Sequence, residues 1–118
     1  MELKGLMAAN VGPFRTEQNL HSAARAIERL KTEIGEVPHS SAAQFDSVLV
    51  DWLDLRNMLL VAQSVVMPAL ARRESRGAHQ REDYPGLDEN WCVNQVVALS
   101  HGEIHLSRSA PSTGKVAA

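Results

Sequence analysis

FDSVLVDWLDLRNMLLVAQSVVMPALARRESR, residues 45–76, is the longest periodic segment of this 118-residue chain. Its apolar residues recur at alternating steps of three and four, at Phe45, Val48, Trp52, Leu55, Leu59, Ala62, Val66 and Ala69. This spacing places one apolar seam along a helix and is typical of helices that pack nearly parallel or antiparallel. The sequence predicts a helix over 45–76, ended by Gly77 and bent at Pro68, which cannot donate a hydrogen bond to the Ser64 carbonyl.

Two further helices are predicted before this segment. Residues 2–10 have apolar positions at helical spacing and stop before Gly12-Pro13. Residues 16–34 begin at Thr16, a good N-cap, and end before Gly35. Because no capping residue precedes the first helix, we expect its natural start to lie upstream of Met1.

The end of the chain has a different pattern. Residues 92–108 are rich in Val and alternate around His101-Gly102, which predicts a β-hairpin. Residues 110–118, rich in small residues and Pro, predict a flexible tail. The expected fold is mainly α: one domain over 1–109, a three-helix, spectrin-like bundle with a C-terminal β-hairpin and a flexible tail.

Composition excludes several classes of function. The net charge is -2 with basic and acidic residues interspersed, so we expect no nucleic-acid binding. Cys92 is the single cysteine and can form no internal disulfide, which favours a reducing cytoplasm and a structural thiol. No run approaches the ~18 apolar residues of a membrane span, and the first ten residues lack a signal-peptide core. We therefore expect no direct membrane insertion.

Candidate chemical groups are few. Ser75, His79 and Asp83 match the residue types of a catalytic triad, but four-residue steps across a helix end do not assemble one. His101 and His105 would lie roughly 13 Å apart on a strand, too far to share a metal. No Gly-rich nucleotide-binding motif is present. We expect no catalytic, cofactor-binding or metal-binding residues in this chain, and we assign Trp52, Met58 and Met67 to core packing.

The residues from Glu74 to Pro85 read ESRGAHQREDYP, a dense run of charged and hydrogen-bonding groups at the predicted helix end. Physical chemistry leaves two interpretations equally open, a solvated charged loop or a docking surface whose arginines and tyrosine contact another domain. The candidate docking residues are Glu74, Ser75, Arg76, Gly77, His79, Arg81, Asp83 and Tyr84.

Residues 69–85, ALARRESRGAHQREDYP, closely resemble the C-terminal region of the succinate dehydrogenase/fumarate reductase flavoprotein family. LDENW at 87–91, FRT at 14–16 and LDLRNML at 53–59 also resemble that region, so the likeness extends to about Arg108. L-Aspartate oxidase shares the domain. It usually has Leu in place of Ala78 and lacks the charge pattern Arg81-Glu82-Asp83, which favours the dehydrogenase/reductase branch.

The resemblance implies membership of an FAD-dependent enzyme that moves a hydride between flavin and the carbon-carbon bond of a dicarboxylate. The flavin-binding and catalytic residues of the family lie in preceding domains, so FAD is implied for the parent protein and not for this chain, which we expect to be inactive alone. The implied partners are the flavin-binding and capping domains, in the cytoplasm. An iron-sulfur subunit and a peripheral place at the cytoplasmic membrane face stay open. A freestanding helical interaction module is the competing hypothesis.

Overall fold

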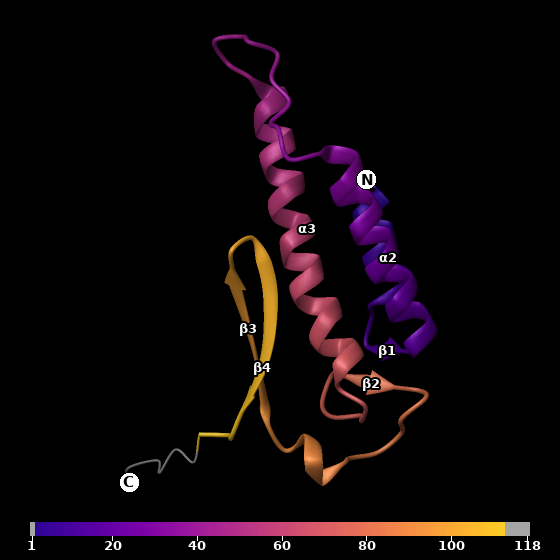
Figure 1. Cartoon of the computed structure of the whole chain (residues 1–118). Coiled ribbons are helices and arrows are strands. Elements are labelled where there is room, and N and C mark those ends of the chain that lie inside the picture. The colour runs from indigo at the N-terminus through magenta and orange to yellow at the C-terminus, as the bar shows by residue number, and fades with distance from the viewer. Residues whose placement is uncertain (1, 113–118) are drawn as a thin grey trace, which may run out of the picture.

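Two long antiparallel helices form the body of the fold (Figure 1). The computed structural model describes residues 2–112. Helix α2 spans Glu17–Ile34 and α3 spans Ser47–Ala71. The Thr16 hydroxyl accepts a hydrogen bond from the Asn19 amide at 3.1 Å and so caps α2, which ends at Gly35. Both ends of α2 lie where the sequence predicts them.

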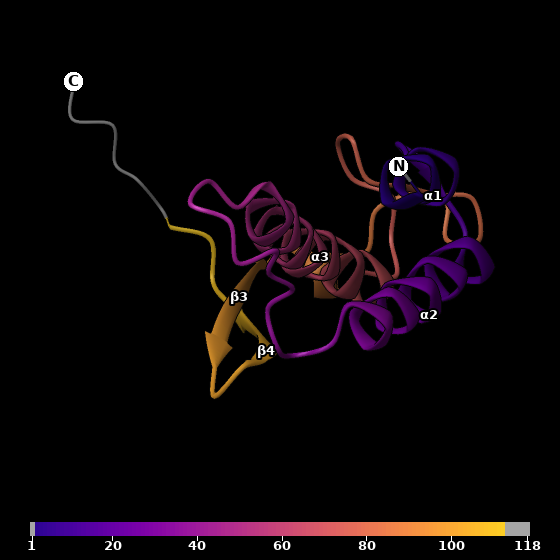
Figure 2. The same cartoon turned by 90° about the horizontal axis from the view of Figure 1, so that it is seen from above.

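The nine-residue helix α1, Glu2–Asn10, packs beside α2 and completes the apolar core. In Figure 2, α1 and the C-terminal hairpin lie on opposite sides of α3. The core combines buried residues of all three helices and the α1–α2 connection: Leu3, Val11, Leu20, Ala23, Ile27, Leu30, Leu59, Ala62, Val66 and Ala69. Three helices with a C-terminal hairpin confirm the predicted mainly-α fold. The finer, spectrin-like arrangement stays a prediction.

Helix α3 is shorter at both ends than the predicted 45–76. Asp46 is its N-cap and accepts from the Leu49 amide at 3.1 Å, which leaves Phe45 outside the helix and 85% exposed. Val48 is also exposed, so the predicted seam is buried only from Trp52 onward. The helix ends at Ala71, and Gly77 therefore does not cap it. The helix ends earlier for a tertiary reason, because the Arg81 side chain donates hydrogen bonds to its last carbonyls, those of Ala69 and Leu70.

Pro68 lies in the last turn of α3, and helix continues for three residues beyond it. The Arg72 amide donates to the Pro68 carbonyl at 3.0 Å and closes that turn. Proline removes the hydrogen bond to the Ser64 carbonyl and its ring crowds that carbonyl, whereas the residues after it keep their own amide donors. The predicted helix on both sides of Pro68 is thus present, although its C-terminal part is short.

Strands β3, Asn94–Ser100, and β4, Glu103–Ser109, form the predicted antiparallel hairpin. The two turn residues have positive φ, 51° at His101 and 79° at Gly102, as a type I′ hairpin turn requires. Residues 110–112 have no regular structure, and residues 113–118 of the predicted tail lie outside the described residues.

The sequence did not predict the second sheet. Strand β1, Phe14–Arg15, pairs in parallel with β2, Gln80–Arg81. This short sheet joins the α1–α2 connection to the chain that follows α3 (Figure 1). Two residues per strand carry too little pattern for sequence reasoning to detect.

Among residues 2–112, one helix, α3, is long and apolar enough to cross a membrane by length and composition. Helix α3 meets this test by average hydropathy, which tolerates Asp54 and Arg56, although it contains no unbroken run of ~18 apolar residues. This is weak evidence for a membrane span, since core helices of proteins with no membrane contact meet the same criterion. One face of α3 is buried against α2 in the core.

Candidate functional site

The segment of residues 74–84 folds back from the end of α3 onto the α1–α2 connection. Backbone bonds from the Gln80 amide to the Pro13 carbonyl, 3.0 Å, and from the Glu82 amide to the Arg15 carbonyl, 2.8 Å, attach it there. At its tip, Arg76 and His79 exchange two backbone bonds of 2.7 and 3.0 Å around Gly77 and Ala78. Gly77 has φ 57°, a conformation that favours glycine.

Glu74 is the buried acid of the 74–84 segment, with 1% of its surface exposed. Its carboxylate accepts from Arg72 at 2.6 Å, from Arg76 at 2.8 and 3.2 Å, and from the Asp88 amide at 2.9 Å. The hydrogen bonds from Arg76 are the main cause that lowers the pKa of Glu74 from 4.5 to about 2; burial opposes them. The carboxylate is ionised at neutral pH and satisfied by four donors.

Arg81 is equally buried, and its guanidinium joins two helix ends. One nitrogen donates to the carbonyls of Ala69 and Leu70, at 3.1 and 3.2 Å, at the C-terminus of α3. The other two nitrogens hold both oxygens of Asp83 at 2.8 and 2.6 Å. Asp83 in turn accepts from the Glu17 amide, 3.1 Å, at the start of α2. Positive charge at a helix C-terminus and negative charge at an N-terminus both suit the helix dipoles.

His79 is fixed by two partners of opposite kind. Its Nδ1 lies 2.9 Å from Arg15 Nη1, which can only donate, and its Nε2 lies 3.0 Å from the Arg72 carbonyl, which can only accept. These partners require a neutral ring protonated at Nε2. Burial is the main cause that lowers the pKa of His79, and the charges of Arg15, Arg81 and Arg72 add to it.

Ser75, His79 and Asp83 are adjacent in sequence, but the fold directs them to separate partners. The Ser75 hydroxyl accepts from the Arg81 amide at 2.8 Å and lies 2.9 Å from the Tyr84 carbonyl, so it closes the segment's own loop. His79 bonds to Arg15 and Asp83 to Arg81. This geometry makes them structural groups of three different contacts.

The other singled-out residues lie apart from this network. His101 is at the hairpin turn, His105 is exposed opposite Ala98, and Cys92 is exposed. Within residues 2–112, no three His, Cys, Asp or Glu side chains could hold a metal ion. Trp52 is buried and donates to the Ile34 carbonyl at 3.0 Å, while Met58 packs against the core.

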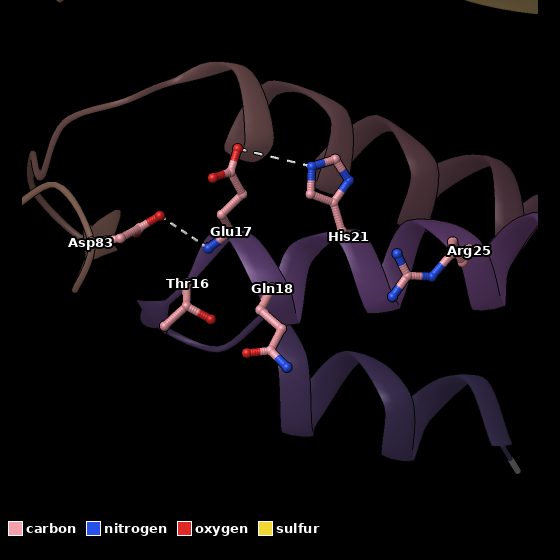
Figure 3. Close-up of a pocket in the computed structure, with 6 residues that line it drawn as sticks. All are labelled: Thr16, Glu17, Gln18, His21, Arg25 and Asp83. Carbon is pink, nitrogen blue, oxygen red and sulfur yellow. Dashed lines mark hydrogen bonds and ion pairs between the residues drawn. The ribbon is translucent and has the colours of Figure 1, made fainter.

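A shallow polar groove adjoins Asp83 at the start of α2 (Figure 3). It is lined by Thr16, Glu17, Gln18, His21, Arg25 and Asp83. Figure 3 shows Glu17 and His21 pointing to one side of α2 and Gln18 to the other. The groups carry both signs of charge and do not converge on one point, so the groove has no defined ligand geometry.

Acidification is expected to lower the free energy of unfolding in two steps. Because the pKa of His79 is lowered by folding, the unfolded chain binds more protons below about pH 6.5, and stability falls as the pH drops through that value. Glu74 and Asp83, each with a folded pKa of about 2, contribute stability that is present above about pH 4.5 and lost as the pH falls toward 2. Urea unfolding at several pH values would measure both steps.

His79→Gln should flatten the upper step of that profile, whereas His105→Gln on the exposed hairpin should leave it unchanged. A higher free energy of unfolding at pH 5 than at pH 8 would contradict the assignment of His79 as a neutral buried ring.

Sequence reasoning missed four residues that build this site. Arg72, Arg15, Glu17 and Asp88 all bind the 74–84 segment, and two of them, Arg15 and Glu17, lie far from it in the sequence. Of the four, only Arg72 could have been suspected from the sequence, because it lies in the last turns of the predicted helix, next to the segment. Together these contacts define a mainly helical domain in which a polar segment locks two helix ends and a chain connection.

Comparison with known proteins identifies the family of this domain. The family described as fumarate reductase flavoprotein C-term matches residues 1–116. A fumarate reductase (CoM/CoB) subunit of Methanothermobacter marburgensis is 38% identical over 90 residues, 76% of this chain and 16% of that protein. L-Aspartate oxidase of Acinetobacter baylyi is 40% identical over 88 residues, 75% of this chain and 15% of the other. The Sdh1 complex of Mycobacterium smegmatis in the apo form superposes with a TM-score of 0.77 at 34% identity, over 93% of this chain and 19% of that one.

The chain therefore belongs to the C-terminal domain family of fumarate reductase and succinate dehydrogenase flavoproteins. It spans about a sixth of the length of the curated relatives that it matches.

Proposed function

We propose that residues 1–109 form a docking domain that braces the flavin-binding part of a larger flavoprotein and performs no catalysis alone. The observation that carries the proposal is the rigid 74–84 segment. Glu74, Ser75 and Arg81 are buried in contacts within the chain, while Gly77 and Ala78 at the tip are exposed. A surface held this firmly can meet another domain with little loss of conformational entropy.

The eight candidate docking residues divide into two roles under this proposal. Glu74, Ser75 and Arg81 are buried and hold the segment in place through hydrogen bonds within the chain. Gly77 and Asp83 are exposed, and Arg76, His79 and Tyr84 are half-buried, so these five are available to a partner. The Arg81 guanidinium also lies 5.0 Å from the centre of the Tyr84 ring, which orients the tyrosine.

The parent protein proposed here is an FAD-dependent oxidoreductase of the succinate dehydrogenase/fumarate reductase type, with dicarboxylate substrates. Support comes from the family match and from relatives named as fumarate reductase and succinate dehydrogenase flavoprotein subunits. FAD would bind in the part of the parent outside this chain. The partners would be its flavin-binding and capping domains, with an iron-sulfur subunit as a further partner, in the cytoplasm or at the cytoplasmic membrane face.

A parent of the L-aspartate oxidase type is the second candidate, favoured by the 40% identity to the Acinetobacter baylyi protein. The Arg81–Asp83 contact supports the first candidate, because this bidentate pair needs the charge pattern that aspartate oxidases usually lack. Reading the coding sequence upstream of Met1 tests both against a freestanding interaction module. A freestanding module requires no in-frame Gly-rich flavin motif there.

Ala78→Asp in the full-length flavoprotein is expected to reduce flavin retention several-fold, because it places a charge in the proposed interface. Ala78 is exposed, so the same change should leave the melting temperature of the 118-residue chain within about 2 °C. Ala43→Asp is the matched control, since Ala43 is exposed in the loop at the opposite end of α3 (Figure 1). Bound flavin is measured by absorbance after gel filtration. Equal flavin content in both variants would contradict docking through this tip.

A further inference from the structure

Helix α3 has apolar residues on more faces than this chain covers. Its buried face packs against α2, yet Val50, Leu53, Val61 and Val65 are exposed. Exposed apolar side chains that gather on one face and are rimmed by polar residues mark an interaction site. The uncovered face therefore requires an explanation beyond the 74–84 segment.

The uncovered face is hollowed into an apolar groove between α1 and α3, with a volume of about 570 Å³. Leu3 and Met7 of α1 and Met58, Val61 and Val65 of α3 supply its apolar lining. Val61 is the most open of these, at 62% exposure. The groove lies on a different part of the fold from the 74–84 segment, which contacts the ends of the helices.

The borders of the groove are polar and carry opposite charges. Lys4 belongs to α1, whereas Asp54 and Asn57 belong to α3. Within the described part of the chain neither Lys4 nor Asp54 has an ion-pair partner. An apolar centre with a polar rim is the anatomy of a protein interface. Lipid is disfavoured, because an aspartate in the centre of a bilayer costs about 2.5–3.5 kcal/mol.

We infer that this groove is covered by a segment of the same flavoprotein chain that lies outside these 118 residues. The inference rests on the proposed function. The relatives that this chain matches are about six times longer than it, so a parent protein of similar length would have ample chain to supply the cover. Charge complementarity defines the chemistry of the segment: apolar anchors facing Val61 and Met58, an acidic residue near Lys4 and a basic residue near Asp54.

Site-directed photo-crosslinking in the full-length flavoprotein tests this inference. The amino acid p-benzoylphenylalanine replaces Val61, and in a parallel sample it replaces Val37, which is 78% exposed in the α2–α3 loop. After irradiation, mass spectrometry of the digested protein identifies the linked peptides. We expect position 61 to link to a peptide of the same chain outside the 118 residues, in at least fivefold higher yield than position 37.

Links only between two copies of the chain, only to lipid in vesicle-containing samples, or only within the 118 residues would overturn the inference. A yield at position 61 no greater than at position 37 would do the same. The result is separable from the test at Ala78. If Ala78→Asp fails to reduce flavin retention while position 61 links as expected, only docking through the 74–84 tip is wrong. If Ala78→Asp reduces flavin retention while position 61 does not link, only the groove contact is wrong.

Discussion

Replacing Arg81 with methionine is expected to lower the free energy of unfolding of this chain by about 2–4 kcal/mol. Methionine keeps the apolar stem but leaves Asp83 without its bidentate partner and the Ala69 and Leu70 carbonyls without a donor. The loss falls mainly on the Ala69 and Leu70 carbonyls at the buried end of α3, because the Asp83 side chain keeps 29% of its surface exposed. Urea unfolding followed by circular dichroism would measure the change, and Arg81→Lys should retain only part of the stability because lysine cannot form the bidentate contact.

The control for Arg81→Met is Arg73→Met, because Arg73 is exposed close to the same helix end. Its effect should stay within about 0.5 kcal/mol. The double variant Arg81→Met with Asp83→Asn should recover part of the loss, since it removes the unpaired carboxylate. A loss below 1 kcal/mol for Arg81→Met would show that α3 ends at Ala71 for another reason.

Glu74→Gln is expected to cost about 2–4 kcal/mol. The amide keeps the shape of the carboxylate but removes the only acidic partner of Arg72 and leaves Arg76 without an ion pair in the described part of the chain. Arg72 also donates to the Trp91 and Val93 carbonyls, at 2.8 and 2.7 Å, and so holds the base of the hairpin. The same variant should therefore accelerate amide hydrogen exchange in β3.

Glu89→Gln is the matched control, because Glu89 is exposed in the short 3-10 helix Glu89–Trp91 and makes no ion pair among residues 2–112. It should change neither the free energy of unfolding by more than about 0.5 kcal/mol nor the exchange rates. If Glu74→Gln loses stability while β3 exchange is unchanged, then Arg72 holds the hairpin independently of Glu74.

The boundaries of α2 and the hairpin were predictable because their signals are local. Thr16 caps the helix through an amide three residues away, and the His101-Gly102 turn sets the strand register directly. The end of α3 was not predictable from Gly77, since the groups that satisfy its carbonyls come from Arg81 and His79. Phe45 fits the heptad spacing, yet Asp46 starts the helix one residue later and leaves it in solvent.

The 74–84 segment shows the same limit at the level of the site. Its charge density was visible in the sequence, but the sequence did not show which of its residues are buried. Glu74 and Arg81 are buried and support the segment, whereas Gly77 and Ala78 are exposed. Charged residues are seldom fully buried, and composition alone predicts exposure for all of them. Glu74 and Arg81 are exceptions because each is paired with oppositely charged groups, which only the tertiary structure reveals.

By itself the sequence determined the three helices, the hairpin and the likeness to the flavoprotein family, because periodicity, capping and turn chemistry act over a few residues. Tertiary structure alone decided that α3 ends at Ala71, that β1 pairs with β2, and that one buried arginine joins the ends of two helices. These features depend on residues more than ten positions apart. Their energy comes from mutual desolvation and pairing, which exist only once the chain has brought them together.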